Sequence, residues 1–310
     1  MLKLVEQLLK RLKLAPPACE PRYYINITSG ESLAISAFVD GDRFVQVKAS
    51  EYLNLAPQYA SYCAASNDFG RFVPRPLGYD ECEGWSIMVT EGSEHTMAGR
   101  ETVLQLAQDE AGKVGDVAAQ LFEFFGRGAA LDGAAASHLS ACRQSELLPV
   151  LREYFEPTPW AAAAAACIGQ AQALDVPAMP EVPQHGDLVF NNLGWAQGQL
   201  VVFDWEDYRK VALPGLDIFT LAMSLLDGDT QAICAMASAP GRADAFIARA
   251  CQLQAITLPL FRSLVPFYML VFLYLKRNYG AQIQQHIGEL LMQMLPRLDP
   301  VPGGDVRRLA

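Results

Sequence analysis

Three oxygen-bearing side chains stand at fixed offsets around a short hairpin, and this spacing constrains the fold more than any other feature. Asp187 follows a His-Gly pair, Asn192 comes five residues later, and Asp204 comes seventeen residues after Asp187. Residues 193–203, between Asn192 and Asp204, form two apolar arms around an Ala-Gln-Gly-Gln turn, the pattern of a β-hairpin. Because a hairpin folds its ends together, we expect Asn192 and Asp204 to lie side by side.

These groups suit phosphoryl transfer. That reaction needs a carboxylate to orient the attacking hydroxyl, and oxygen ligands to hold Mg²⁺ on the nucleotide phosphates. The alternative interpretation is an Asx turn with a solvated carboxylate at a strand end. We favour it less, because His-Gly-Asp with Asn at this offset is a rare combination, which the hairpin and the second Asp make rarer.

The motif resembles that of the aminoglycoside phosphotransferase and choline kinase-like family, a branch of the protein-kinase-like fold. The family pattern is His-Gly-Asp-x4-Asn, then Asp-Trp-Glu, then Gly-Asp-Pro-x-x-Asp. Residues 204–206 match the second element. The third element, residues 212–217, keeps Pro214 and Asp217 but has Ala-Leu where Gly-Asp is usual.

The resemblance implies a role for each residue of the motif. Asp187 would be the catalytic base or the group that orients the hydroxyl. Asn192 and Asp204 would be Mg²⁺ ligands. His185 would be a buried scaffold residue, and Asp217 would bond the backbone near the catalytic loop.

The resemblance also implies an α+β, two-lobed protein-kinase-like fold. Residues 1–92 would form the nucleotide-binding N-lobe, a small antiparallel sheet with one main helix. Residues 93–310 would form a larger, mostly helical C-lobe with the catalytic loop and the substrate site. The local pattern agrees, because five β-like runs surround one helix near 57–67; the runs are 22–27, 32–39, 43–48, 77–80 and 85–90. Residues 1–14 read as an amphipathic helix that docks on the small lobe rather than on a membrane.

Lys48 ends an alternating strand, where a lysine is usually solvated. The resemblance implies instead that it reaches the α- and β-phosphates of ATP. Ser29 and Gly30 lie in the loop that would cradle phosphate, although this loop has a single glycine. Val89 to Glu91 would join the lobes and bind adenine through backbone groups.

The usual partner of this lysine, a glutamate on the following helix, is the gap in the resemblance. Glu51 stands before the expected helix, and the helix itself contains no glutamate. Either Glu51 belongs to an earlier helical turn, or the ion pair is absent and the chain is a degenerate kinase. We expect Glu206 to be solvated and outside the catalytic set. The triplet at 68–70 spells the Asp-Phe-Gly of protein kinases, but it precedes the catalytic loop, so we interpret it as a turn.

Composition bounds the remaining possibilities. The chain has 310 residues, of which 51% are hydrophobic and 19% charged, which allows two modest domains. Its net charge of -10 argues against a nucleic-acid partner and slightly favours a cationic acceptor. Seven scattered cysteines indicate reduced thiols and a cytoplasmic location.

Most of the second lobe reads as helix, and the most apolar stretch is Leu258 to Leu275. Its longest charge-free run is thirteen residues, shorter than the roughly 20 that a spanning helix needs. We therefore expect a buried helix and no membrane span. The expected helices are 101–125 (ending before Gly126), 145–154, 160–174, 218–226, 230–236, 241–256, 259–279 and 281–294.

The acceptor should be a small molecule. Only nine residues separate Asp204 from Pro214, which leaves no long segment for docking a polypeptide. The sequence thus predicts ATP- and Mg²⁺-dependent phosphorylation of a small-molecule hydroxyl, as in aminoglycoside, choline or homoserine kinases. The alternative is a nucleotide-binding, pseudokinase-like regulatory module without turnover. The choice between ATP and GTP, the acceptor and the oligomeric state stay open.

Overall fold

The computed structural model describes residues 1–14, 22–27, 32–40, 43–92, 116–131 and 144–295. The chain divides into two compact units. The N-terminal unit comprises Met1–Met97 together with Leu193–Glu206. The C-terminal unit comprises Ala98–Asn192 and Asp207–Ala310.

A five-stranded antiparallel sheet forms the centre of the N-terminal unit, in the order β1-β2-β3-β5-β4. Its strands are β1 (Arg22–Ile27), β2 (Leu33–Asp40), β3 (Arg43–Ser50), β4 (Pro76–Cys82) and β5 (Trp85–Glu91). In β3, Val45, Val47 and Ala49 are buried on one face. Lys48 therefore points to the opposite face, because successive side chains in a strand alternate.

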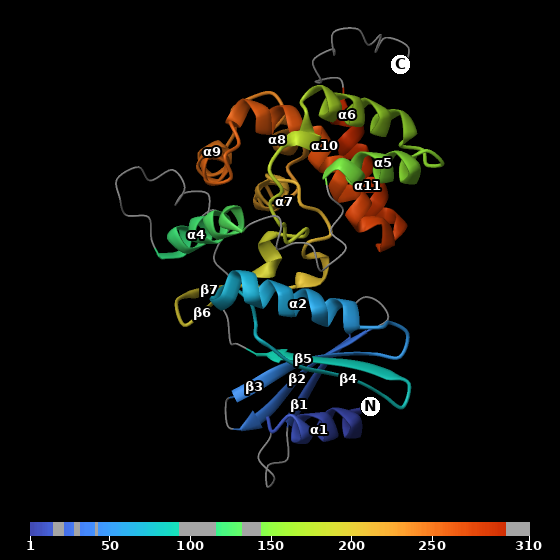
Figure 1. Ribbon diagram of the computed structural model, residues 1–310, viewed down its shortest axis with the longest axis vertical. Helices are drawn as coiled ribbons and strands as arrows, with labels where there is room; N and C mark the ends of the chain where they lie inside the picture. Colours follow the sequence, from blue (N-terminus) through green and yellow to red (C-terminus); the bar gives the residue numbers. More distant parts are fainter. Residues whose placement is uncertain (15–21, 28–31, 41–42, 93–115, 132–143, 296–310) are drawn as a thin grey trace. The chain divides into compact units, whose positions relative to one another are not determined.

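Helix α1 (Leu2–Arg11) covers the face of the sheet that Val45 and Val47 line (Figure 1). Its buried stripe, Leu4, Val5, Leu8 and Leu9, has the spacing of an amphipathic helix. These contacts confirm the expectation that the helix in residues 1–14 docks on the sheet.

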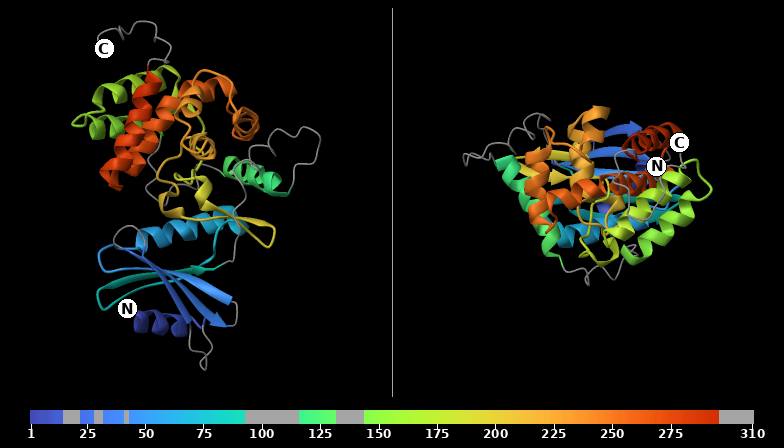
Figure 2. Two further views of the ribbon diagram at one scale, coloured as in Figure 1. Left: turned by 180° about the vertical axis from the view of Figure 1, so that it is seen from behind. Right: turned by 90° about the horizontal axis from the view of Figure 1, so that it is seen from above.

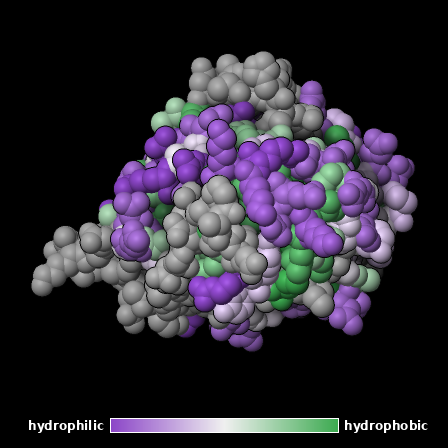
Figure 3. All heavy atoms as spheres, turned by 90° about the horizontal axis from the view of Figure 1, so that it is seen from below, coloured by the Kyte–Doolittle hydropathy of each residue, from purple (hydrophilic) through white to green (hydrophobic). Residues whose placement is uncertain are grey.

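Hydrophilic residues predominate on the face of the molecule that Figure 3 shows, with smaller hydrophobic patches among them.

Helix α2 (Ala56–Phe69) covers the other face of the sheet (Figure 1) and is followed by the 3-10 turn η1 (Gly70–Phe72). Pro57 lies in the first helical turn, where a missing N–H costs nothing. The helix ends at Gly70, whose φ of 57° favours glycine. The Asp-Phe-Gly triplet therefore terminates a helix, as expected, and Phe69 packs on Trp205 with ring centroids 5.2 Å apart.

The hairpin after the catalytic loop has the expected form. Strands β6 (Leu193–Ala196) and β7 (Gln199–Val202) pair in antiparallel register, with Leu193 opposite Val202. The two turn residues, Gln197 and Gly198, both have positive φ (52° and 76°). A two-residue hairpin with this geometry matches the right-handed twist of its strands.

The described part of the C-terminal unit is mostly helical, and α5 and α6 lie beside α10 and α11 (Figure 2). The helices are α4 (Asp116–Ala130), α5 (Gln144–Phe155), α6 (Ala161–Ala173), α7 (Leu216–Leu225), α8 (Thr230–Ala235), α9 (Asp244–Leu253), α10 (Leu258–Leu275) and α11 (Ala281–Met294). Short 3-10 turns are η3 (Val176–Ala178), η4 (Phe190–Asn192) and η6 (Lys276–Asn278), while η5 (Trp205–Asp207) lies where the chain passes between the units.

The end of α4 differs from the expectation. We expected the helix at 101–125 to end before Gly126, but α4 continues to Ala130. The buried residues Phe122, Phe124 and Phe125 anchor this helix, and tertiary packing overrides the low helix propensity of glycine. The first part of that expected helix, 101–115, lies outside the described residues.

Helix α10 is a core helix. By length and composition alone, Leu258–Asn278 is long and apolar enough to cross a membrane, and 67% of its most apolar 18-residue window is buried. Among the described elements, it packs against α5, α6, α7, α9 and α11. This packing confirms the expected buried helix. The α-helix ends at Leu275, earlier than expected, and Lys276 begins the 3-10 turn η6.

Candidate active site

Asp217, in the first turn of α7, holds the catalytic loop. Its carboxylate accepts hydrogen bonds from the backbone N–H of His185 (2.7 Å) and of Gly186 (2.9 Å). Its own N–H donates to Gln184 Oε1 at 2.9 Å. Asp217 therefore has the backbone-bonding role that the sequence suggested, despite the Ala-Leu that replaces Gly-Asp before it.

Burial raises the pKa of the Asp217 carboxyl. The charge of His185 and the two backbone hydrogen bonds act in the opposite direction, and the negative charge of Asp187 adds to the rise. The net direction shows that removal from water dominates.

Gly186 permits the close packing of this loop. Its φ is +87°, and a Cβ there would lie 3.0 Å from both the Cβ and the carbonyl oxygen of Asp207. A larger residue would need both a strained backbone and a displaced neighbour. The glycine of the His-Gly-Asp motif therefore has a structural reason.

His185 is fully buried, and its Nδ1 accepts a hydrogen bond from the N–H of Asp187 at 3.2 Å. This bond shapes the backbone on which Asp187 is carried. The interpretation of His185 as a scaffold residue is confirmed by this contact.

Asn192 is held in a definite orientation. Its Nδ2 donates to the carbonyl oxygen of Asp187 at 2.9 Å, which turns the amide oxygen away from that bond. Mg²⁺ takes oxygen ligands, so this orientation leaves the amide oxygen available for the predicted role as a ligand.

The side chain of Asp187 is only 12% exposed, and its Oδ2 lies 2.7 Å from Nζ of Lys276. The sequence analysis did not single out Lys276. A lysine just after an apolar helix is ordinarily explained by the helix dipole, so no local signal distinguishes it.

Lys48 has a partner that we did not expect. Its Nζ lies 3.1 Å from Oε2 of Glu206, and both residues belong to the N-terminal unit. The first alternative drawn from the sequence is therefore wrong, because Glu51 is exposed. The expected pair with a glutamate on the following helix is absent from α2, which contains no glutamate, and Glu206 takes its place. Glu206 was also wrongly expected to be solvated, because η5 turns its carboxylate toward β3. The two residues are 158 positions apart, a separation that periodicity cannot bridge.

Asp204 adopts a left-handed backbone conformation, with φ of 61°. Such residues are uncommon and concentrate at functional sites. Its N–H donates to the hydroxyl of Tyr62 at 3.1 Å, so a tyrosine of α2 holds the backbone of Asp204. Burial and the nearby carboxylate of Asp204 raise the pKa of Tyr62 well above its ordinary value, which keeps the hydroxyl neutral.

The residues expected to bind adenine lie on β5, which pairs with β3 on one side and β4 on the other. Val89 pairs with Val47, the N–H of Glu91 donates to the carbonyl of Arg75, and that of Gly92 donates to Phe44. These two N–H groups already have acceptors, so a purine would have to use carbonyl oxygens here. Adenine binding by Val89 and Glu91 stays a prediction. Ser29 and Gly30 lie outside the described residues.

The predicted site residues fall into two sets. Lys48 and Asp204 belong to the N-terminal unit, as does Glu206, which was not predicted as a site residue; Asp187 and Asn192 belong to the C-terminal unit. Their convergence on one metal stays a prediction. In the described part of the chain, no three His, Cys, Asp or Glu side chains gather as a metal cluster. A Mg²⁺ ion on a nucleotide needs fewer protein ligands, because phosphates and water complete its shell.

Comparison with known proteins identifies the family of this chain. Residues 24–252 match the phosphotransferase enzyme family, over more than half of the chain. The chain belongs to this family. The resemblance read from the sequence is therefore confirmed. A search of curated proteins found none that matches.

Solved structures show the same fold as this family member. A thermostable mutant of aminoglycoside phosphotransferase APH(4)-Ia, in complex with AMP-PNP and hygromycin B, is 13% identical with a TM-score of 0.62, covering 96% of this chain and 99% of that one. An aminoglycoside phosphotransferase in complex with GDP and kanamycin is 14% identical, with a TM-score of 0.60 and coverage of 94% and 99%.

A third structure, described as a fructosamine-3-kinase from Thermobifida fusca, is 14% identical, with a TM-score of 0.54 and coverage of 93% and 98%. At these identities the likeness establishes the fold. The expected two-lobed, kinase-like architecture is thereby confirmed.

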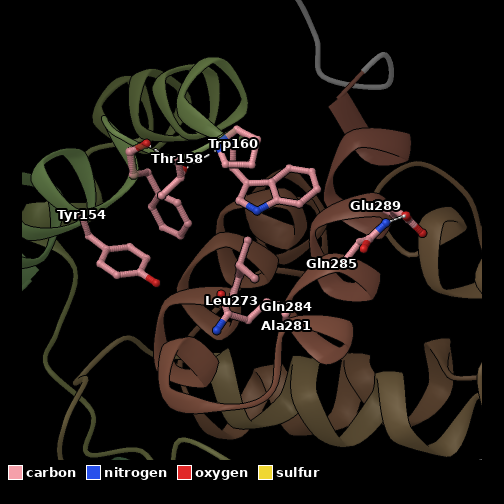
Figure 4. Close-up of a pocket in the computed structure, with 10 residues that line it drawn as sticks. Tyr154, Thr158, Trp160, Leu273, Ala281, Gln284, Gln285 and Glu289 are labelled. Carbon is pink, nitrogen blue, oxygen red and sulfur yellow. Dashed lines mark hydrogen bonds between the residues drawn. The ribbon is translucent and has the colours of Figure 1, made fainter.

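The C-terminal unit of this phosphotransferase family member contains a cavity of about 400 Å³. It opens between the α5–α6 connection and helices α10 and α11 (Figure 4). Aromatic rings form one wall, and Gln285 and Glu289, which hydrogen bond at 3.0 Å, lie on another. The lining residues are Tyr154, Phe155, Thr158, Pro159, Trp160, Leu273, Ala281, Gln284, Gln285 and Glu289.

Proposed function

We propose that this protein transfers a phosphoryl group from a Mg²⁺-bound nucleotide to a hydroxyl of a small molecule. The observation that carries the proposal is the catalytic loop. Asp217 and His185 lock its backbone, so that Asp187 presents a nearly buried carboxylate in a defined position. A positioned carboxylate of this kind accepts the proton of an attacking hydroxyl.

The remaining residues bind and orient the donor. Lys48, steadied by Glu206, supplies a positive charge for the nucleotide phosphates. The amide oxygen of Asn192 and the carboxylate of Asp204 would hold Mg²⁺. When bound, this ion neutralises charge on the phosphate oxygens. Most of the rate enhancement then comes from positioning and from charge stabilisation.

The segment after Asp207 supports a small acceptor rather than a polypeptide. The N–H of Arg209 donates to the carbonyl of Gln184, and the N–H of Val182 donates to the carbonyl of Ala212. Backbone bonds thus tie this short segment to the strand-like approach to the catalytic loop. The backbone groups engaged in these bonds are not available to pair with a peptide strand.

Two features favour an amine-bearing, polyhydroxylated acceptor. Relatives of the same fold have been solved with hygromycin B and with kanamycin. The cavity beside α11 combines aromatic rings with the carboxylate of Glu289, a chemistry that suits a cation. Both ATP and GTP stay candidate donors, because relatives bind AMP-PNP or GDP. Localisation in the cytoplasm stays a prediction.

A nucleotide-consumption screen against amino sugars, amino alcohols and hydroxy amino acids would test the proposal. With the best acceptor, Asp187→Asn should abolish turnover while Mg²⁺-nucleotide binding survives. Asp204→Ala should instead weaken Mg²⁺-nucleotide binding. Asp229→Asn, at an exposed helix cap, is the control and should behave as the wild type.

Undiminished turnover by Asp187→Asn would refute the proposal. Nucleotide-induced thermal stabilisation without consumption across the whole panel would favour the regulatory module instead. The presence of the Lys48–Glu206 pair already weakens that alternative, since it was motivated by a missing partner.

A further inference from the structure

Lys276 is a buried cation in direct contact with the carboxylate assigned to catalysis. Its Nζ lies 2.7 Å from Oδ2 of Asp187 and 3.9 Å from Oδ2 of Asp207. The Lys276 side chain is only 5% exposed. Lysine is almost never buried to this extent unless it is paired. Its position therefore depends on these carboxylates.

The surroundings restrict where the ammonium can go. Nζ lies 4.4 Å from the ring centroid of Tyr279 and 5.4 Å from that of Phe272. Both rings flank Lys276 in the chain, where α10 gives way to η6. Two aromatic faces favour the cation in this place.

Asp187 is the principal partner. The other oxygen of Asp207, Oδ1, accepts a hydrogen bond from Lys210, whose side chain is half exposed. Asp207 is therefore neutralised from outside the buried cluster, whereas Asp187 meets Lys276 at the shorter distance. Among the described residues, Nζ has no acceptor in hydrogen-bonding geometry. The attraction is thus mainly one of charge.

Stability alone does not explain such a residue. A buried ion pair seldom stabilises a fold more than apolar side chains of the same volume, because both charges lose their hydration. The apolar end of α10 would accept methionine here. A cation retained at this place, beside the carboxylate assigned to proton transfer, indicates a task other than packing.

We propose that Lys276 is a positioning residue that holds Oδ2 of Asp187, and so leaves Oδ1 as the oxygen that receives the proton of the acceptor hydroxyl. The inference rests on the proposed function. It also connects the reaction to the cavity, because Leu273, in the same last turn of α10, lines the cavity wall (Figure 4). An acceptor that contacts this turn from the cavity would therefore affect Lys276, the residue that orients Asp187.

The first test needs no substrate. Thermal unfolding is measured for the full-length wild type, Lys276→Met, Asp187→Asn and the double variant. If the two side chains pair, removing the lysine charge costs less once Asp187 is neutral, so the shifts in Tm are not additive. Lys210→Met is the matched control and should be additive with Asp187→Asn. Additive shifts for Lys276→Met would overturn the pairing.

The second test uses the acceptor and nucleotide found by the consumption screen. Misplacing a reacting group by about 1 Å costs up to about 100-fold in rate, so Lys276→Met should lower kcat by about 10–100-fold. The KM for nucleotide should change less than about twofold, because only the base is misplaced. Lys276→Arg should recover part of kcat, and Lys210→Met should match the wild type.

The outcomes separate this inference from the proposed function. If Lys276→Met lowers Tm but leaves kcat unchanged while Asp187→Asn is inactive, the role of Lys276 is overturned and the proposed function stands. A rise in KM with unchanged kcat would overturn it as well. Undiminished turnover by Asp187→Asn would refute the proposed function and this role together.

Discussion

Removal of the Asp217 carboxylate should destabilise the catalytic loop more than any exposed cap can. In Asp217→Ala, the buried N–H groups of His185 and Gly186 both lose their acceptor. A buried donor left unpaired costs about 1–3 kcal/mol, so two of them cost about 2–6 kcal/mol. Burial raises the pKa of this carboxyl, so alanine also relieves an unfavourable buried charge. We therefore expect a net loss of about 2–4 kcal/mol.

Hydrogen exchange is the suitable assay, because it reports on a segment and does not require the two units to unfold together. Peptides that span residues 182–190 should exchange faster in Asp217→Ala than in the wild type. Asp229→Ala is the matched control: its exposed carboxylate caps α8 by accepting a single bond, from Ala232 N–H at 3.0 Å. Loss of such a cap costs about 1 kcal/mol.

The pH dependence follows from the sign of the pKa shift. Because the folded carboxyl of Asp217 titrates above 3.8, the folded state holds this proton more tightly than the unfolded chain does. The stability that the proton supplies is complete below pH 3.8 and declines as the pH rises through the folded pKa. The stability of the wild type relative to Asp217→Asn should therefore fall as pH rises from 4 towards neutrality. Equal losses in Asp217→Ala and Asp229→Ala, or a rising difference with pH, would refute the reasoning.

Two further predictions concern the N-terminal unit and the buried thiols. Glu206→Gln should weaken Mg²⁺-nucleotide binding by about fivefold in titration calorimetry, because a partly exposed ion pair contributes about 1 kcal/mol to the placement of Lys48. Glu51→Gln is the control and should leave the affinity unchanged. A loss of affinity in Glu51→Gln but not in Glu206→Gln would contradict the assignment. Burial raises the pKa of the Cys167 and Cys251 thiols to about 12. At pH 8 both thiols should therefore resist alkylation by iodoacetamide until the protein unfolds. Rapid labelling of these two cysteines in the native protein would count against their burial.

Local pattern in the sequence was sufficient for most of the secondary structure. The alternation of Val45, Val47 and Ala49 predicted β3, and the spacing of Leu4, Leu8 and their neighbours predicted α1. The Gln-Gly turn predicted the β6–β7 hairpin, because only a few residue types adopt positive φ readily. These features depend on residues close in the chain, so a single sequence reveals them.

The catalytic motif was equally local. Asp187, His185 and Asn192 lie within eight residues, and their bonds to one another follow from that spacing. The end of α4 was misjudged, since buried phenylalanines extend it past Gly126, and α10 ends earlier than expected. Propensity is a weak signal wherever a large side chain can be buried.

The partners of Lys48 and Lys276 were decided by tertiary structure alone. Lys48 meets Glu206, although the order of residues pointed to Glu51 or to no partner. Lys276 meets Asp187 at the end of a helix whose composition suggested only packing. The sequence by itself determined which chemical groups the chain carries and which elements hold them. The choice of which charges meet depends on how distant segments pack, because attraction between two charged groups depends on their distance in space and not on their separation in the chain.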